Sequence, residues 1–371
     1  MAYAAFGPLT EPDREARASC EVDGSSCRGH APSSSAAASS SPKARRTHPP
    51  AAAGASPTAK PTTSTSRFGT EFTPYVDVLQ NTPFDLASSA RTVGIKHYNL
   101  AFIVAGNGCT ATWGGSLAVS SATVANRVAA FRAAGGHVRI SFGGESGTEL
   151  AAACDSVDEL AAAYQSVITA YSATEIDFDV EGSELSNSDA NDRRAKAIAV
   201  LERTASAAGK TLEVSATLPV GPQGLTSASV SLLSNAASNG ATIHVVNIMA
   251  MDYGDDAAPN PDGQMGSYAI SAMKGTQAQL KSIFKLSDTA AWHRVAVTPL
   301  IGVNEPETEV FTTSDAAQLG TFARSKGAAY VSMWAISRDK PCADGVTANA
   351  TSDACAGNAG QTFAFTKAFM G

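Results

Sequence analysis

Residues 174–181 read Thr-Glu-Ile-Asp-Phe-Asp-Val-Glu, so apolar and acidic side chains alternate along them. A period of two is typical of a β-strand, with Asp177, Asp179 and Glu181 on one face. Like charges about 6.6–7 Å apart raise one another's pKa. Glu181, at the carboxyl end, is therefore a natural candidate for an acid that keeps its proton near neutral pH. Taken alone, the octet also fits an edge strand with a solvated acidic face.

The sequence around this octet repeats the same kind of segment eight times. Apolar, β-branched runs alternate with Ala-rich segments of helical spacing, such as residues 122–134 and 159–170, and many of these close on Gly. This alternation predicts an α/β fold, a (β/α)8 TIM barrel over residues 68–371. A doubly wound open sheet is the alternative, but the glycine-rich phosphate turn that usually follows its first strand does not occur. The expected strands are residues 72–78, 97–104, 137–144, 174–181, 212–218, 243–253, 295–302 and 330–336.

The first 67 residues differ in composition from the rest. Ser, Ala, Pro, Thr and Arg dominate residues 1–67, which predicts a disordered segment or linker. Residues 1–67 carry eight Lys and Arg against five Asp and Glu, whereas residues 68–371 carry nineteen against twenty-nine. An acidic folded part argues against a nucleic-acid partner. No apolar run approaches the length of a membrane span, so we expect no membrane partner.

The six cysteines fall into three local sets, none with the CxxC spacing of a zinc or redox site. An even count in loop-like surroundings predicts disulfides and a secreted protein, with unpaired buried thiols as the alternative. Residues 1–30 show no basic stretch followed by an apolar one, so no ordinary signal peptide is visible. The sets are Cys20 with Cys27, Cys109 with Cys154, and Cys342 with Cys355.

Polar and aromatic residues occur at the ends of several expected strands. Active sites of TIM barrels gather at the carboxyl ends of the strands. Glu181 ends the fourth strand, residues 143–145 end the third, Asp252 and Tyr253 end the sixth, and Trp334 lies late in the eighth. The sequence therefore predicts that groups from four strands converge on one mouth.

Over roughly residues 70–371, the sequence resembles the glycoside hydrolases of family 18, the chitinases and their relatives. The family motif D-x-x-D-x-D-x-E is met by Asp177, Asp179 and Glu181, with Thr174 in place of the first Asp. Residues 141–144 read Ser-Phe-Gly-Gly and match the motif S-x-G-G.

Two further segments carry the resemblance. The motif M-x-Y-D reads Met249-Ala250-Met251-Asp252, so Met251 takes the place of the tyrosine and Tyr253 follows. The segment around Trp334 resembles the eighth strand, whose tryptophan forms the floor of a sugar subsite. No insertion is long enough for an extra α+β subdomain, so the sequence resembles the compact bacterial and fungal chitinases.

The resemblance implies an endo-acting chitinase that cleaves β-1,4 bonds of chitin or chito-oligosaccharides with retention. In this family the substrate itself replaces the protein nucleophile. Glu181 would protonate the glycosidic oxygen, Asp179 would orient the acetamide group, and Asp177 would share the proton deeper in the barrel. We expect no cofactor and a monomer; no HxH or HExxH spacing occurs, so we expect no metal site either.

The resemblance also implies contacts to the substrate from other strands. Trp334 would stack under the sugar ring, and Tyr253 with Asp252 would hold the acetamide group. Each position has a purely structural alternative: barrel packing for Trp334, a core or rim aromatic for Tyr253, and close packing for the two glycines. The expected substrate-binding residues are Tyr253, Asp252, Trp334, Met249, Met251, Gly143 and Gly144.

Two other functions fit the same scaffold. One is an endo-β-N-acetylglucosaminidase that cuts the core of N-linked glycans. The other is a catalytically weak chitin-binding lectin. Such lectins typically lose the terminal Glu of the octet, so Glu181 favours an enzyme, whereas Thr174 and Met251 keep the lectin interpretation open.

Overall fold

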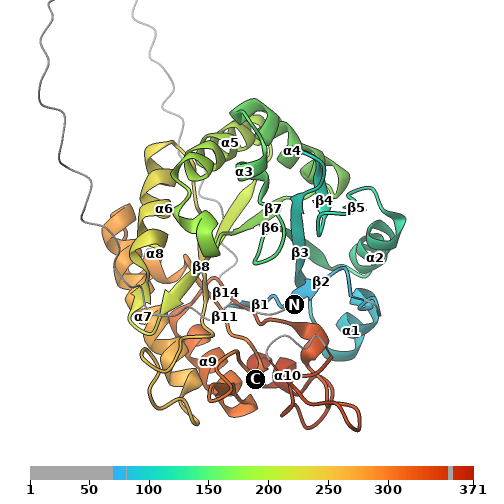
Figure 1. Ribbon diagram of the computed structural model, residues 1–371, viewed down its shortest axis with the longest axis vertical. Coiled ribbons are helices and arrows are strands. Elements are labelled where there is room, and N and C mark those ends of the chain that lie inside the picture. Colours follow the sequence, from blue (N-terminus) through green and yellow to red (C-terminus); the bar gives the residue numbers. More distant parts are fainter. Residues whose placement is uncertain (1–69, 81, 350–353) are drawn as a thin grey trace, which may run out of the picture. The chain divides into compact units, whose positions relative to one another are not determined.

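The computed structural model describes residues 70–80, 82–349 and 354–371, so the predicted disordered segment, residues 1–67, lies outside the described residues. The described part is an α/β fold in which helices surround a mostly parallel sheet (Figure 1). None of its helices combines the length and the apolar character needed to cross a bilayer. The strands are β1 Glu71–Phe72, β2 Tyr75–Asp77, β3 His97–Ala105, β4 Ala111–Trp113, β5 Leu117–Ala118, β6 His137–Gly143, β7 Glu175–Asp179, β8 Glu213–Gly221, β9 Gly224–Leu225, β10 Val245–Met249, β11 Val295–Thr298, β12 Gly302–Val303, β13 Val310–Phe311 and β14 Tyr330–Val331.

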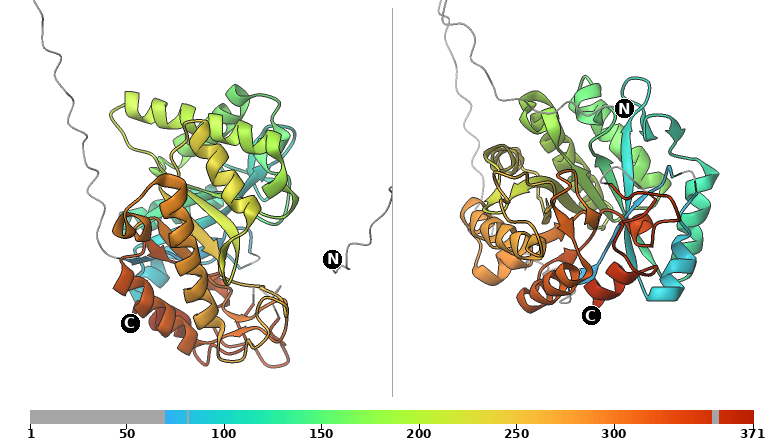
Figure 2. Two further views of the ribbon diagram at one scale, coloured as in Figure 1. Left: turned by 90° about the vertical axis from the view of Figure 1, so that its left-hand side faces the viewer. Right: turned by 60° about the horizontal axis from the view of Figure 1, so that its bottom comes forward.

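The sheet runs in the order β1-β14-β11-β10-β8-β7-β6-β3, and each neighbouring pair in this series is parallel. The segment at residues 71–77 contacts both ends of the series, because β1 pairs with β14 and β2 pairs with β3. Phe72 of β1 also stacks on Phe369, with ring centroids 5.4 Å apart, so the blue start and the red end of the described chain lie side by side (Figure 2). The arrangement is TIM-barrel-like, as neighbouring strand–helix repeats predict.

The helices begin and end where the sequence supplies caps. The Asp85 carboxylate accepts the backbone N–H of Ser88 at 2.8 Å, and Thr312 forms a capping box with Asp315. Gly94 and Gly327 take the left-handed conformation at helix ends, as expected for C-caps. The helices are α1 Leu86–Val93, α2 Ala122–Ala133, α3 Leu150–Ala153, α4 Val157–Ala170, the 3-10 helix η1 Gly182–Ser186, α5 Ser188–Ala207, α6 Ser227–Ser238, α7 Met265–Phe284, α8 Asp288–Trp292, α9 Thr313–Lys326, the 3-10 helix η2 Ile336–Arg338 and α10 Ala364–Met370.

Six expected strands end earlier in the structure than predicted, and three of these ends bear on the site. The sixth, expected over residues 243–253, is β10 and ends at Met249, because Asp252 has φ of 49°, in the left-handed region that strands do not use. The eighth is β14 and ends at Val331, so Trp334 lies beyond it and joins Leu300 only through an isolated bridge. The octet strand is β7 and ends at Asp179. Among the predicted site residues, Glu181, Asp252, Tyr253 and Trp334 therefore lie on the segments that leave the sheet.

Two of the three expected disulfides are confirmed. Cys109 is bonded to Cys154, which ties the turn after β3 to the end of α3, and Cys342 is bonded to Cys355. The third set, Cys20 and Cys27, lies outside the described residues. The Cys109–Cys154 bond holds the segment that follows β6, and β6 pairs with the octet strand β7.

Candidate active site

Asp177 lies fully buried at the centre of the sheet, where hydroxyl groups from neighbouring strands bind it. Ser141 on β6 donates to its Oδ2 at 2.7 Å, and Tyr75 on β2 donates to the same oxygen at 3.0 Å. Ser215 and Thr217 on β8 both donate to its Oδ1. These bonds from three elements hold the carboxylate in one orientation beneath the rest of the octet. Only Ser141 was part of an expected motif.

Asp179 is the next inward side chain of β7 and is also buried. No donor among the described residues reaches its buried Oδ1. Burial raises the pKa of Asp179 well above its ordinary value, and the charges of Glu181, Asp177 and Glu149 add to this in that order. An oxygen that is buried and unpaired requires a donor. A ligand group with an N–H can supply it.

Glu181 follows β7 by two residues and is half-buried. Burial raises its pKa to about 7, and the charges of Glu145 and Asp252 contribute further. The sequence predicted a raised pKa from the neighbouring acids of the same strand. In the structure, burial is the largest cause of the raised pKa. The charges that add to it belong to Glu145 and Asp252, which lie on two other loops. At neutral pH a substantial fraction of Glu181 is thus protonated and can donate a proton.

Asp179 and Glu181 line one cavity of about 150 Å³ together with residues of the segment after β6. The strands β6 and β7 are in register there, with Gly143 opposite Asp179. Gly143 has φ of 94°, and a Cβ on it would lie 2.0 Å from the carbonyl oxygen of Asp179. Close packing therefore requires glycine at this position. The cavity is lined by Gly144, Glu145, Gly147, Glu149, Asp179, Glu181, Gly182, Ser183 and Glu184.

Asp252 lies close enough to Glu181 to raise its pKa, although the two come from different strands. The Oδ1 of Asp252 accepts the backbone N–H of Glu305 at 2.7 Å, which fixes the loop after β10 to the loop after β12. The residue as a whole is exposed, yet partial removal from water and the nearby carboxylates raise its pKa to about 6. The carboxylate of Glu309 accepts the backbone N–H groups of Tyr253 and Gly254 and holds the same loop.

Tyr253 lies beside the site, not in the cavity around Glu181. Its ring packs against Tyr268 of α7, with centroids 6.1 Å apart, and its hydroxyl is buried. This geometry agrees with the rim-aromatic interpretation. Met249 and Met251 are half-buried on either side of the end of β10, and no polar contact of either side chain is observed within the described residues.

Trp334 is half-buried and forms an aromatic cluster with two residues that were not predicted for the site. Its ring stacks on Phe102 with centroids 5.4 Å apart and an interplanar angle of 17°, and it lies 5.8 Å from the ring of Tyr75. Tyr75 in turn donates to Asp177. The Tyr75 side chain therefore connects Trp334 to the carboxylate of Asp177. A flat apolar surface beside carboxylates suits a sugar ring.

The comparisons with known proteins agree with this geometry. No protein-family model matches the chain. Over 277 residues, 73% of this chain, it is 34% identical both to the probable bifunctional chitinase/lysozyme of Escherichia coli and to Endochitinase 11 of Metarhizium anisopliae. The chain spans only 31% and 53% of the length of these two relatives.

A comparison with solved structures decides the family of this chain. The catalytic domain of a hyperthermophilic chitinase from Pyrococcus furiosus superposes with a TM-score of 0.71 and 30% identity, over 81% of this chain and 94% of that chain. The protein belongs to the family 18 chitinases. A family 18 chitinase of Cycas revoluta, at 11% identity and a TM-score of 0.51, shares the fold.

The first position of the family 18 motif is Thr174, which lies before β7 and is exposed. The inward position next to it, Glu175, forms an ion pair with Arg139 of β6 at 3.0 Å. Arg139 is buried and also lies 3.3 Å from the carboxylate of Glu213. An ion-pair cluster around the buried Arg139 thus occupies the layer below Asp177. Although Thr174 replaces the first Asp of the motif, the inward-facing Asp177 and Asp179 are both present.

A buried ion pair supports the wall of the cavity and was not predicted from the sequence. Arg194 of α5 donates to both carboxylate oxygens of Glu149, one of these bonds measuring 2.6 Å from Nε to Oε1. Both side chains are almost completely buried, and Glu149 lines the cavity. Bidentate arginine pairing fixes a carboxylate in position.

Replacing Arg194 by Met should destabilise the fold by about 3–5 kcal/mol, because Glu149 then remains buried without its partner. Urea denaturation measures the change. The double variant Arg194→Met with Glu149→Met removes both charges and should recover most of the loss. A single variant as stable as wild type would show that the pair does not hold the wall.

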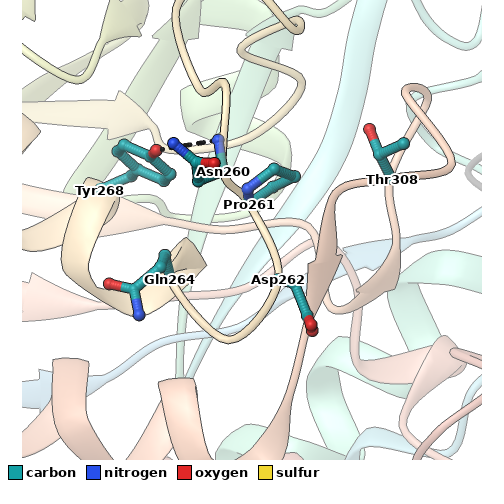
Figure 3. A pocket seen from close by; sticks show the side chains of 6 residues that line it. All are labelled: Asn260, Pro261, Asp262, Gln264, Tyr268 and Thr308. Atoms are coloured by element: carbon teal, nitrogen blue, oxygen red, sulfur yellow. Dashed lines mark hydrogen bonds between the residues drawn. The ribbon is translucent and has the colours of Figure 1, made fainter.

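A larger depression lies outside the cavity, on the loop before α7 (Figure 3). It is open, has a volume of about 800 Å³, and contains one acid, Asp262. The hydroxyl of Tyr268 accepts the backbone N–H of Asn260 there at 3.4 Å. With a single exposed carboxylate, the depression lacks the paired acids that glycoside hydrolysis requires. Its lining residues are Asn260, Pro261, Asp262, Gln264, Tyr268 and Thr308.

Proposed function

We propose that this family 18 protein is a chitinase that hydrolyses β-1,4 bonds between N-acetylglucosamine units of chitin or chito-oligosaccharides, with retention. The observation that carries the proposal is the shared cavity of Asp179 and Glu181. One of these acids has a pKa of about 7, and the other has a buried oxygen without a donor among the described residues.

The reaction uses the substrate's own acetamide group in place of a protein nucleophile. Glu181 donates its proton to the glycosidic oxygen, and the leaving sugar departs with a free hydroxyl. The acetamide carbonyl oxygen of the remaining sugar bonds to the anomeric carbon and gives an oxazolinium ion. Water then attacks that carbon, Glu181 takes a proton from the water, and the configuration is retained.

Asp179 acts on the acetamide group in this mechanism. Its unpaired Oδ1 accepts the acetamide N–H, which orients the carbonyl oxygen and stabilises the positive charge of the oxazolinium ion. Asp177, held by its hydroxyl donors, keeps Asp179 in place from below. Trp334 supplies the apolar surface for the sugar, and Asp252 faces the site from the opposite loop. Of the other expected substrate contacts, Gly144 lines the cavity and Gly143 packs against the backbone of Asp179, while Met249, Met251 and Tyr253 remain proposed contacts to the sugar.

We further propose that residues 68–371 form one catalytic domain built as a closed eight-stranded barrel. The segment at residues 71–77 supplies the first strand, since it pairs at both ends of the sheet. The two disulfides fit an oxidising compartment, so we propose a secreted monomer.

The pH dependence of hydrolysis follows from the role of Glu181 as an acid. Because only the protonated form is active, kcat/KM should fall as the pH rises through the pKa of about 7, by about tenfold per pH unit. Initial rates on chitotetraose from about pH 5 to about pH 9 measure this decline, the alkaline limb of the pH profile. Rates that keep increasing up to about pH 9 would contradict the assignment of Glu181 as the proton donor.

Chitotetraose and a high-mannose glycoprotein together test the substrate. We expect the protein to cleave chitotetraose and to release little glycan. Glycan release without oligomer cleavage would favour an endo-β-N-acetylglucosaminidase. Binding of the oligomer without cleavage would favour a lectin.

A further inference from the structure

The segment at residues 144–156, between β6 and α4, forms one wall of the catalytic cavity and is fixed at several points. The backbone N–H of Ala105 donates to the carbonyl oxygen of Thr148 at 2.8 Å. Cys154 is bonded to Cys109, and Glu149 is paired with Arg194. These three attachments hold the backbone of the segment in place beside the cavity.

One of those side chains is Glu145, which the proposed mechanism does not use. Gly143 lies opposite Asp179 in the pairing of β6 with β7, and both chains leave the sheet at that level. Glu145 and Glu181 each follow two residues later, and both line the same cavity. The register of two neighbouring strands therefore places the two carboxyl groups on one site from different elements.

Several charged groups face Glu181 and Glu145. Burial raises the pKa of Glu181 most, and among the charges that raise it Glu145 precedes Asp252. Arg194 is bound to Glu149, and the charge of Arg338 lowers the pKa of Asp252. The facing carboxylates are Asp179 on β7, Glu184 on η1, Glu145 and Glu149 on the wall segment, Asp252 after β10, and Glu305, which faces Glu145 from the loop after β12.

We propose that Glu145 is a positioning residue for the reaction: its carboxylate, on the wall of the cavity that Glu181 also lines, keeps the transferable proton on Glu181 at neutral pH. The inference rests on the proposed function and names a residue that sets the pH range over which the protein hydrolyses its substrate. Glu145 needs no contact with the sugar for this role. A negative charge close to an acid in a partly desolvated site favours the neutral form of that acid.

The test is the pH profile of chitotetraose hydrolysis by Glu145→Gln. Without the neighbouring charge, Glu181 loses its proton earlier, so the alkaline limb of kcat/KM should move down by about one pH unit. Rates at about pH 5 should stay within about threefold of wild type, whereas rates above the limb should fall by about tenfold. Glu145→Asp keeps the charge and should retain most of the wild-type profile.

Glu184→Gln is the matched control, because it removes one carboxylate from the same cavity that is not among the charges raising the pKa of Glu181. Its alkaline limb should stay where the wild-type limb lies. An unmoved limb in Glu145→Gln, or a rate loss equal at every pH, would overturn the inference while leaving hydrolysis itself intact. A wild-type protein that does not cleave chitotetraose would instead overturn the proposed function, and this inference with it.

Discussion

Glu181→Gln should lower the rate of chitotetraose hydrolysis by about 10³-fold or more while oligosaccharide binding stays within a few-fold of wild type. The amide keeps the shape of the side chain but has no proton that it can transfer. The half-buried position and the pKa of about 7 suit Glu181 to donate a proton at neutral pH. Initial rates and isothermal titration with chitotetraose measure the two effects separately.

Glu159→Gln provides the matched control for this change. It makes the same replacement on the exposed first turn of α4, away from the cavity lining, and should leave both rate and binding unaltered. A Glu181→Gln variant with a near-normal rate would refute the assignment of the acid. Loss of binding together with the rate would point to a damaged site.

Asp179→Asn should lower the rate by about 10²-fold or more, because the amide can no longer stabilise the positive charge of the acetamide group. The buried Oδ1 of Asp179 accepts no hydrogen bond within the described chain, so it remains available to the substrate. The loss should fall mainly on kcat, since the interaction strengthens as the oxazolinium ion forms. Steady-state kinetics on chitotetraose separate kcat from KM.

The thermal unfolding midpoint separates this effect from a structural one. Asp179 has a raised pKa, and its buried Oδ1 has no donor among the described residues, so the neutral amide should leave the fold at least as stable as wild type. A rate loss below tenfold would count against the proposed role. A large drop in the midpoint would mean that the rate loss reports unfolding.

The family and the acids of the octet could be predicted because they depend on local sequence. Alternation placed Asp177 and Asp179 on one face of a strand, and β7 has that alternation. The number and spacing of strand–helix repeats predicted the mostly parallel sheet. The strand ends could not be predicted as well, since the left-handed backbone of Asp252 depends on contacts with the loop after β12.

The surroundings of the acids depend on contacts between distant segments and therefore escaped prediction. Tyr75 lies 102 positions before Asp177, and nothing in its local sequence indicates a bond to that carboxylate. The pair of Glu149 and Arg194 joins residues 45 positions apart. Glu145 stood at the end of an expected strand, but its effect on Glu181 becomes visible only when the register of β6 and β7 is known.

The position of the Tyr253 side chain could not be predicted from the motif alone. The family resemblance implied that Tyr253, together with Asp252, holds the acetamide group of the substrate. In the structure its ring packs on Tyr268 and its hydroxyl is buried beside the site. Tyr253 lies two positions after Met251, and spacing alone does not reveal which way a side chain on this loop points.

The anomeric form of the product tests the central claim most directly. Chitotetraose is incubated with the wild-type protein, and the products are resolved by NMR before they mutarotate. The account predicts fresh β-anomer at the new reducing end, as retention through an oxazolinium ion requires. Fresh α-anomer would contradict the proposed mechanism, because it would show direct attack by water and leave no role for the acetamide group held by Asp179.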